Sequence, residues 1–283
     1  MGTLLSSYIF PHPPIIVPEI GRGEERGAAN TIEGCQRAAK DIKDNNPDTI
    51  VVITPHGPAF RDAVSISVQE RLNGSFKNFR HPDVRLQFEN DLELVERILR
   101  YSREQGIMVA ELGPKLIARF GIETELDHGA MVPLYYIAKE LSSFKIVHVC
   151  MGFLSFDELF KFGNAIARAI AEVDRGFVVV ASGDLSHRLT HDAPCGYSKR
   201  GKEFDDLFVG LLNEGKFDSI ISLEEDLIEE AGECGLRPFT IMFGCLKDYI
   251  IKPEVFSYEG PFAVGYCVAK LEVKGRKIEG ECY

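Results

Sequence analysis

Short apolar runs alternate along this chain with longer stretches in which apolar residues recur at helical spacing. Such alternation is typical of a layered α/β fold. Strands are expected at Leu4–Phe10, Thr49–Thr54, Ala63–Val68, Lys145–Cys150, Phe177–Ala181 and Ala263–Leu271. Helices are expected at Ala28–Asp44, Asp91–Gln105, Ala130–Leu141, Phe156–Val173, Lys199–Leu212 and Pro238–Leu246.

Two of the expected strands are apolar on both faces. Thr49–Thr54 reads TIVVIT and Phe177–Ala181 reads FVVVA, without the polar alternation of a half-exposed strand. Strands of this kind lie at the centre of a sheet that helices cover on both sides. The pattern therefore predicts central strands buried between two layers of helices.

Local signals refine this picture at two places. Ser155 and Glu158 form an S-x-x-E capping box, which predicts that a helix begins there. Asn73-Gly74, between VSISVQERL and SFKNF, is typical of a hairpin with a type I′ turn. Because we find no repeat and no linker-like stretch, we expect one domain over residues 1–283, with a polar C-terminal tail from about residue 272.

Charge and cysteine content narrow the possible functions. The 32 basic and 43 acidic residues give a formal net charge of −11. Such a surface repels phosphate backbones and anionic lipids, so we expect neither nucleic acid nor membrane as a partner. The seven cysteines are odd in number and form no CxxC pair. Reduced thiols in a cytoplasmic protein are the simplest interpretation.

Three of the seven histidines follow apolar strands directly. His12 comes after SSYIF, His56 after TIVVIT and His187 after FVVVASGD. In open α/β sheets the ligand crevice lies at the carboxyl ends of the strands, so these imidazoles are expected at one edge. One such histidine is usually an ordinary loop residue, but three together favour a metal site. His128, in ELDHGAMVPL, is a fourth candidate, whereas His148, inside KIVHVC, is expected to be a buried core residue.

Two histidines alone make a poor metal site, so a third metal ligand is needed. The segment EEAGECGLRPF offers Glu233 and Cys234 as candidates. Two histidines and one carboxylate on one face form the usual ligand set of non-haem Fe(II) oxygenases. On the residues alone, however, Glu233 is better explained as a solvated charge in the acidic run Glu224–Glu233.

Several short motifs share their order and spacing with a known family. From about His12 to Leu246, the chain resembles the LigB superfamily, the catalytic subunits of class III extradiol ring-cleavage dioxygenases. The matching motifs are His12 after the first strand, His56-Gly57, Asp127-His128-Gly129 with Val132-Pro133-Leu134, Gly183-Asp184-Leu185-Ser186-His187, Lys202-Glu203-Phe204-Asp205 and Glu233-Cys234-Gly235.

The resemblance implies a fold and a metal site. The fold would be a three-layer α/β/α sandwich with a mixed, largely parallel sheet. His12, His56 and Glu233 would hold Fe(II), although zinc or another divalent metal would also suit such ligands. The substrates would be a small catechol-type aromatic diol and O₂, and the protein would form a homo-oligomer, most simply a dimer.

The resemblance also implies roles for residues around the metal. His187 would act as the catalytic acid and base, and His128 would assist beside the substrate. Asp127 and Asp184 would orient ligands or bases through hydrogen bonds, although simple loop capping explains them equally well.

One position departs from the dioxygenase pattern. The ligand glutamate of those enzymes stands directly before the glycine, where this chain has Cys234. Cys234-Gly235-Leu236-Arg237-Pro238 is similar to the Cys-Gly-x-x-Pro of Memo-like proteins and of the AmmeMemoRadiSam group. We prefer Glu233 as the third ligand, because Fe(II) that activates oxygen suits a hard carboxylate better than a thiolate.

Two other functions remain open from the sequence. The chain could be a Memo-like metal-binding or interaction protein without dioxygenase activity, with Cys234 as the third ligand. It could also be a zinc-dependent hydrolase that uses the same cluster, with His187 as general base.

Overall fold

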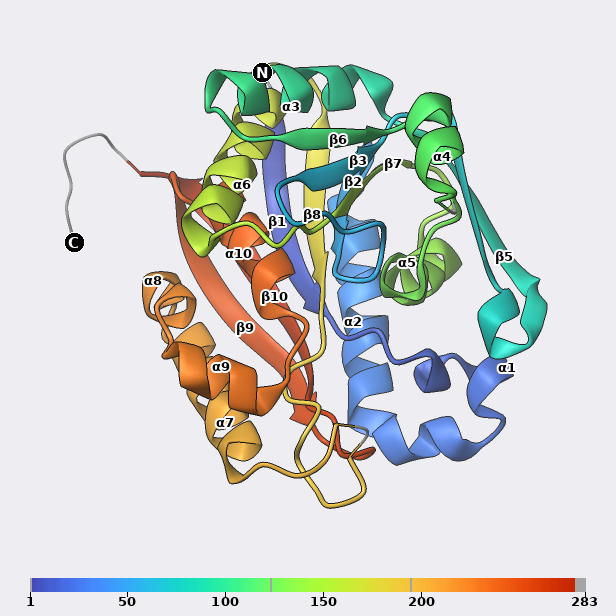
Figure 1. Ribbon diagram of the computed structural model, residues 1–283, viewed down its shortest axis with the longest axis vertical. Helices are drawn as coiled ribbons and strands as arrows, with labels where there is room; N and C mark the ends of the chain where they lie inside the picture. Colours follow the sequence, from blue (N-terminus) through green and yellow to red (C-terminus); the bar gives the residue numbers. More distant parts are fainter. Residues whose placement is uncertain (1, 123, 194, 278–283) are drawn as a thin grey trace.

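Within the described residues, ten strands form one mixed sheet, and helices lie against it (Figure 1). The computed structural model describes residues 2–122, 124–193 and 195–277. The strands are β1 Thr3–Phe10, β2 Thr49–Thr54, β3 Val64–Ser67, β4 Arg71–Phe76, β5 His81–Asn90, β6 Val109–Leu112, β7 Lys145–Cys150, β8 Gly176–Ser182, β9 Tyr249–Glu259 and β10 Tyr266–Arg276.

The helices vary widely in length. The α-helices are α1 Pro18–Gly21, α2 Ala29–Asn45, α3 Leu92–Glu104, α4 Pro114–Phe120, α5 His128–Glu140, α6 Phe156–Ala171, α7 Lys199–Asn213, α8 Phe217–Ile221, α9 Glu225–Ala231 and α10 Leu236–Cys245. The 3-10 helices are η1 Pro14–Ile16, η2 Glu24–Ala28 and η3 Lys77–Phe79.

The centre of the sheet is parallel and its margins are antiparallel. The strand order is β4-β5-β7-β2-β8-β1-β10-β9, and β3 joins β7 to β6. β5, β7, β2, β8 and β1 run parallel, whereas β10, β9, β4 and β3 each pair antiparallel with a neighbour. The predicted α/β class, with a mixed and largely parallel sheet, is confirmed.

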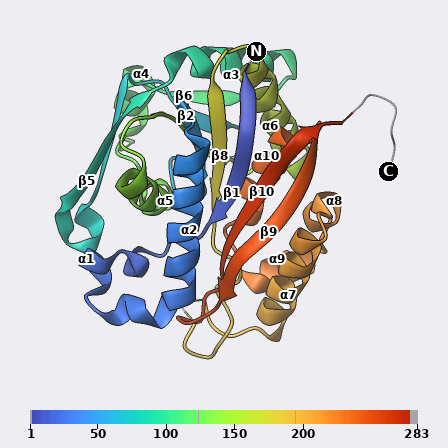
Figure 2. The same ribbon diagram turned by 180° about the vertical axis from the view of Figure 1, so that it is seen from behind.

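Alternate residues of the central strands pack into two separate cores. In β2, Ile50 and Val52 join the core that contains the apolar sides of α2 and α5. Val51 and Ile53 point the other way, into the core that contains α3, α6 and α10. The two helix layers therefore lie on opposite faces of the sheet (Figures 1 and 2), which is the expected three-layer arrangement.

The capping box predicted at Ser155 is present at the start of α6. The Ser155 hydroxyl accepts a hydrogen bond from the Glu158 amide at 3.3 Å. The Glu158 carboxylate in turn accepts one from the Ser155 amide at 2.9 Å. Both orphan donors of the first turn are thereby satisfied, as the sequence predicted.

The hairpin turn predicted at Asn73-Gly74 is wrong. Both residues lie inside β4, where they pair with Gln87 and Leu86 of β5. The chain turns instead through η3, which ends at Arg80 with a φ of 64°. Gly74 serves packing here, because a Cβ atom on it would lie 2.3 Å from the Met131 sulfur of α5.

The C-terminal strand continues beyond its expected end. β10 pairs with β9 as far as Arg276, so the polar tail expected from about residue 272 begins within a strand. Residues 278–283 lie outside the described part of the chain. No helix among the described residues has the length and apolar character needed to cross a membrane.

Candidate metal centre

Three adjacent parallel strands end at the same edge of the sheet, in the order β2, β8, β1. Phe10, the last residue of β1, pairs with Ser182, the last residue of β8. Two residues beyond the strand ends stand His12 after β1, His56 after β2 and Asp184 after β8. The register of the sheet therefore delivers three polar side chains to one place.

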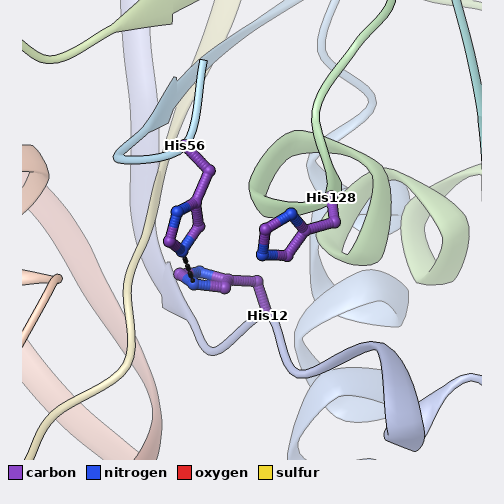
Figure 3. A group of neighbouring side chains, drawn as sticks. All are labelled: His12, His56 and His128. Carbon is purple, nitrogen blue, oxygen red and sulfur yellow. Dashed lines mark hydrogen bonds between the residues drawn. The ribbon is translucent and has the colours of Figure 1, made fainter. Parts of the chain in front are cut away.

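The imidazoles of His12, His56 and His128 converge at this edge (Figure 3). The Nε2 atoms of His12 and His56 are 2.8 Å apart. The rings of His56 and His128 stack, with centroids 4.3 Å apart and 23° between their planes. One potential ligand atom from each of the three residues lies within 4.8 Å of the others, which is close enough to share a metal ion.

Neighbouring groups fix the orientation of the His12 ring. Its Nδ1 lies 2.9 Å from the Ser182 hydroxyl, and its backbone amide donates to the Asp184 carboxylate at 2.9 Å. A ring nitrogen held in this way leaves the other nitrogen to face the cluster. The backbone amide of His56 donates to the Thr54 hydroxyl at 3.2 Å, which ties that residue to the end of β2.

His128 is presented by the first turn of α5. Asp127 is the N-cap of this helix, and its carboxylate accepts hydrogen bonds from the Gly129 and Ala130 amides at 2.9 and 3.3 Å. The same oxygen accepts a hydrogen bond from the Thr54 hydroxyl at 2.6 Å. Helix α5 is thus tied to the end of β2 at the residue that precedes the candidate ligand.

Burial sets the charge state of the cluster. Desolvation lowers the pKa of His12, of His56 and of His128 to about 4 in each case, against the opposing effect of nearby carboxylates. At neutral pH all three imidazoles are therefore uncharged, which is the form that binds metals.

Cys234 adds a thiol to the imidazoles at this edge of the sheet. Its sulfur lies 3.6 Å from His12 Nε2 and 3.8 Å from His187 Nε2, and it accepts a hydrogen bond from the Asp184 amide at 3.3 Å. Cys234, His12 and Asp184 form a further group whose ligand atoms lie within 4.8 Å of one another. Burial raises the pKa of the Cys234 thiol, so the thiol is protonated in the metal-free protein.

Glu233 points elsewhere. Its carboxylate accepts a hydrogen bond from the Leu236 amide at 2.5 Å, at the start of α10, and burial raises its pKa to about 7. Among the described residues, Glu233 belongs to none of the groups with converging ligand atoms. Of the two candidates for third ligand, the structure brings Cys234 beside His12.

His187 lies at the rim of the cluster, with 21% of its side chain exposed. Its Nε2 is 3.9 Å from the Asp184 carboxylate. Burial acts to lower the pKa of His187, but the nearby carboxylates, Asp184 first and then Glu233, outweigh it and raise the pKa. His187 is therefore the imidazole of this cluster that can carry a proton near neutral pH.

Asp205 of α7 supports the loop that carries His187, a role that the sequence analysis missed. Its carboxylate accepts hydrogen bonds from the Ser186 amide at 2.8 Å and from the Tyr258 hydroxyl at 2.7 Å. Burial raises its pKa to about 7. From sequence, Asp205 was named only within the motif Lys202-Glu203-Phe204-Asp205 and was given no role, although an acidic residue between Phe204 and Phe208 on the apolar side of a helix was a further signal.

A cavity of about 580 Å³ opens beside the cluster. It is lined by His56, Gly57, Pro58, Ser75, Asn78, Phe79, Ile122, Glu125, Leu126, Asp127 and His128. The ring of Phe79 meets that of His128 edge-on, with centroids 5.5 Å apart. The volume is within the range of small-molecule sites. A larger cavity, of about 720 Å³, lies away from these histidines, around Phe217 of α8 and Tyr249 of β9.

Residues 6–269 match the family described as the catalytic LigB subunit of aromatic ring-opening dioxygenase. Protein CA_C1420 of Clostridium acetobutylicum is 40% identical over 265 residues, which cover 94% of this chain and 57% of that protein. The chain therefore spans little more than half the length of this relative.

Relatives with lower sequence identity include a named dioxygenase and a MEMO1 family protein. The 3,4-dihydroxyphenylacetate 2,3-dioxygenase of Escherichia coli is 26% identical, over 87% of this chain and 91% of that enzyme. A MEMO1 family protein of Methanosarcina mazei is 28% identical, over 71% of this chain and 63% of its own length. The crystal structure of the uncharacterized protein JW3007 from Escherichia coli K12 is similar in fold, with a TM-score of 0.60, 13% identity, and coverage of 94% of this chain and 99% of that one.

Proposed function

The chain belongs to the family of catalytic LigB subunits of aromatic ring-opening dioxygenases, and from this premise we propose that it is a metal-dependent enzyme that cleaves a small aromatic diol with O₂. The observation that carries the proposal is the convergence of three uncharged imidazoles beside a cavity of about 580 Å³. Uncharged imidazoles at the edge of an open cavity suit a metal ion that keeps positions free for substrate.

The donor set fits a divalent metal ion. His12 and His56 would be ligands, because their Nε2 atoms lie 2.8 Å apart and need lose no proton at neutral pH. We expect Cys234 rather than Glu233 as the third ligand, since the Cys234 sulfur already contacts His12 while the Glu233 carboxylate accepts a hydrogen bond from the Leu236 amide. This reverses the preference drawn from sequence. Fe(II) and zinc both accept such donors.

The residues around the metal would manage protons and hold the substrate. When bound, the metal would lower the pKa of a ligated phenol hydroxyl and, as Fe(II), would also activate O₂. His187 would take the remaining hydroxyl proton and later return it, because the nearby Asp184 carboxylate raises the pKa of its imidazole. His128 lies close enough to His12 and His56 to contact the same metal ion, and with Phe79 it would also bound one side of the substrate.

The test is oxygen uptake by protein loaded anaerobically with Fe(II) and offered a panel of catechols. We expect oxygen consumption together with the absorbance of a ring-cleavage product. His187→Ala should lower kcat by about 10²- to 10⁴-fold while leaving the iron content unchanged. Iron-loaded protein that consumes no oxygen with any catechol would overturn the proposal.

A second candidate is a Memo-like metal-binding protein without dioxygenase activity. The contact of the Cys234 thiol with His12, and the similarity to a MEMO1 family protein, favour it. Zinc affinities of Cys234→Ala and Glu233→Ala compare the two possible third ligands directly. Loss of the true ligand should weaken binding by about 100-fold or more, whereas loss of the other should change it little.

Metal content separates these candidates from a third. Protein isolated with zinc that never turns over catechols after iron loading, but hydrolyses ester or amide substrates, would be the zinc hydrolase that the sequence left open. The same protein without hydrolytic activity would support the Memo-like alternative. Elemental analysis of the protein as purified is the first measurement.

A further inference from the structure

A second histidine network lies beneath the candidate metal centre. His148, in the middle of β7, is 3% exposed. Its Nε2 lies 3.0 Å from the Asp127 carboxylate oxygen Oδ2, and its Nδ1 lies 3.0 Å from the Ser67 hydroxyl of β3. Because both ring nitrogens have partners, the His148 imidazole is fixed in one orientation.

The contact between His148 and Asp127 joins an imidazole and a carboxylate inside the protein, where their side chains are 3% and 11% exposed. Burial acts to lower the pKa of His148, but Cys150 and Asp127 outweigh it and raise the pKa to about 10. The pKa of Asp127 is held below its usual range by His148, against the effect of burial. A buried polar contact whose two partners are satisfied by further hydrogen bonds rigidifies its surroundings.

Asp127 divides its two oxygens between two tasks. Oδ1 caps α5 and accepts from the Thr54 hydroxyl, whereas Oδ2 faces His148. Rotation of the carboxylate would disturb both sets of contacts together. The residue that follows Asp127 is His128, whose ring stacks on that of His56. The orientation of Asp127 therefore fixes where the first side chain of α5 points.

Cys150 does not make this network a nucleophilic triad. Its sulfur lies 3.7 Å from His148 Nε2, the same nitrogen that faces Asp127. In a triad the nucleophile and the carboxylate bind opposite nitrogens of the imidazole. The Cys150 side chain is also fully buried, so no substrate can reach it.

We propose that His148 is a positioning residue for the candidate metal centre: through Asp127 it holds the first turn of α5 so that the His128 imidazole faces His12 and His56. The proposal rests on the metal-dependent function proposed above. It assigns His148 no contact with metal or substrate. Its effect on the centre passes through a single side chain, that of His128.

Two conservative variants separate positioning from simple packing. In His148→Gln, the side-chain amide nitrogen can replace Nε2 and donate to Asp127. In His148→Asn, the amide can replace Nδ1 and keep Ser67, but it is too short to reach Asp127. We expect Co(II), used as a spectroscopic probe, to bind about 10- to 100-fold more weakly to His148→Asn, with an altered visible spectrum, and nearly normally to His148→Gln.

A double-mutant cycle with His128→Ala identifies the route of the effect. If His148 acts through His128, His148→Asn should cause no further loss of Co(II) affinity in the His128→Ala background. Additive losses, or equal effects of the Asn and Gln variants, would overturn the proposal. Ser102→Ala controls for general destabilisation, because it removes a buried hydrogen bond to Ile98 within α3.

A measurement on the metal-free protein keeps this test separate from the proposed function. In protein with ¹⁵N-labelled histidine, the side-chain resonances of His128 should shift or split in His148→Asn but stay close to the wild type in His148→Gln. Unchanged His128 resonances in His148→Asn would reject the positioning role even if no Co(II) binds. Absence of Co(II) binding to the wild type, with the His128 shift present, would instead reject the metal-dependent function.

Discussion

At the scale of single residues, the charge of each donor decides what the candidate centre can do. The three imidazoles are uncharged because burial lowers the pKa of each to about 4. Cys234 and Glu233 differ from them, since burial raises the pKa of both groups. A metal ion bound here would therefore displace a proton from the third ligand but none from the histidines.

This difference makes the pH dependence of zinc affinity diagnostic. Above pH 6 the histidines release no proton. If Cys234 is the third ligand, affinity should rise about tenfold per pH unit through pH 8.5, because its thiol stays protonated in the metal-free protein. If Glu233 is the ligand, the rise should level off above its pKa of about 7. Chelator competition between pH 6 and 8.5 measures the slope, and Cys234→Ala should flatten it if the thiol binds.

Asp205 offers a second test at this scale. Its folded-state pKa of about 7 lies above the ordinary value of 3.8, so the folded protein holds this proton longer than the unfolded chain. The stabilisation from Asp205 is present below about pH 4 and is lost as pH rises through 7. Asp205→Asn, which stays neutral, should therefore gain about 2 kcal/mol of unfolding free energy relative to the wild type between pH 5 and pH 8. Urea denaturation of both proteins at pH 5 and at pH 8 measures this gain. A stability difference between variant and wild type that is the same at both pH values would contradict the prediction.

The sequence predicted the histidines at the strand ends, but not which third donor faces them. His12 and His56 follow apolar strands, a pattern visible in the chain itself. Cys234 lies in an irregular segment, where the amides of Cys234 and Gly235 both donate to the Asp184 carbonyl, at 3.4 and 3.1 Å. The direction of the Cys234 side chain is therefore set by contacts with a segment that is distant in sequence. Helical periodicity within the segment itself does not predict such contacts.

At the scale of elements, buried strands and capped helices were predicted, and edge elements were not. β2 and β7 match their expected bounds because their apolar character reflects burial on both faces. β5, which pairs along most of its length with the marginal strand β4, carries charged residues at alternate positions, and β9 carries them at the other margin. Such strands depend on pairing with neighbours, so their own sequences indicate them weakly.

Packing between β4 and α5 gives a prediction at this scale. A Cβ atom at Gly74 would lie 2.3 Å from the Met131 sulfur and 2.9 Å from Leu126 Cβ. Gly74→Ala should therefore destabilise the protein by about 1 to 3 kcal/mol. In the Met131→Ala background, Gly74→Ala should cost less stability than it does in the wild type, because the side chain with which the new Cβ collides has been shortened. Thermal unfolding of the four proteins tests this, and strict additivity would show that the two residues do not collide.

At the scale of the whole molecule, the candidate centre joins segments that are far apart in the chain. It contacts the ends of β1, β2 and β8, the start of α5 and the segment before α10. An ion held there binds the folded state and not the separated segments, so it must stabilise the fold.

Removal of metal should therefore lower the thermal stability. At a free metal concentration 100 times Kd, binding contributes about 2.7 kcal/mol, which corresponds to a Tm increase of about 5 °C for a chain of this size. Treatment with a chelator should reverse the increase. His12→Ala should show the same Tm with and without metal, and an undiminished shift in that variant would place the bound ion elsewhere.

The position of β1 in the sheet also governs how the protein is made. This first strand lies between β8 and β10, whose residues 176–182 and 266–276 leave the ribosome long after it does. During translation the nascent β1 has neither neighbouring strand. Its apolar residues therefore stay exposed, or bound to a chaperone, until β8 and β10 have been made. His12, which follows it, meets Cys234 only after 222 more residues have been added. A metal ion held by both residues could therefore bind only after Cys234 has been made, and amino-terminal fragments that end before Cys234 could not hold it in this way.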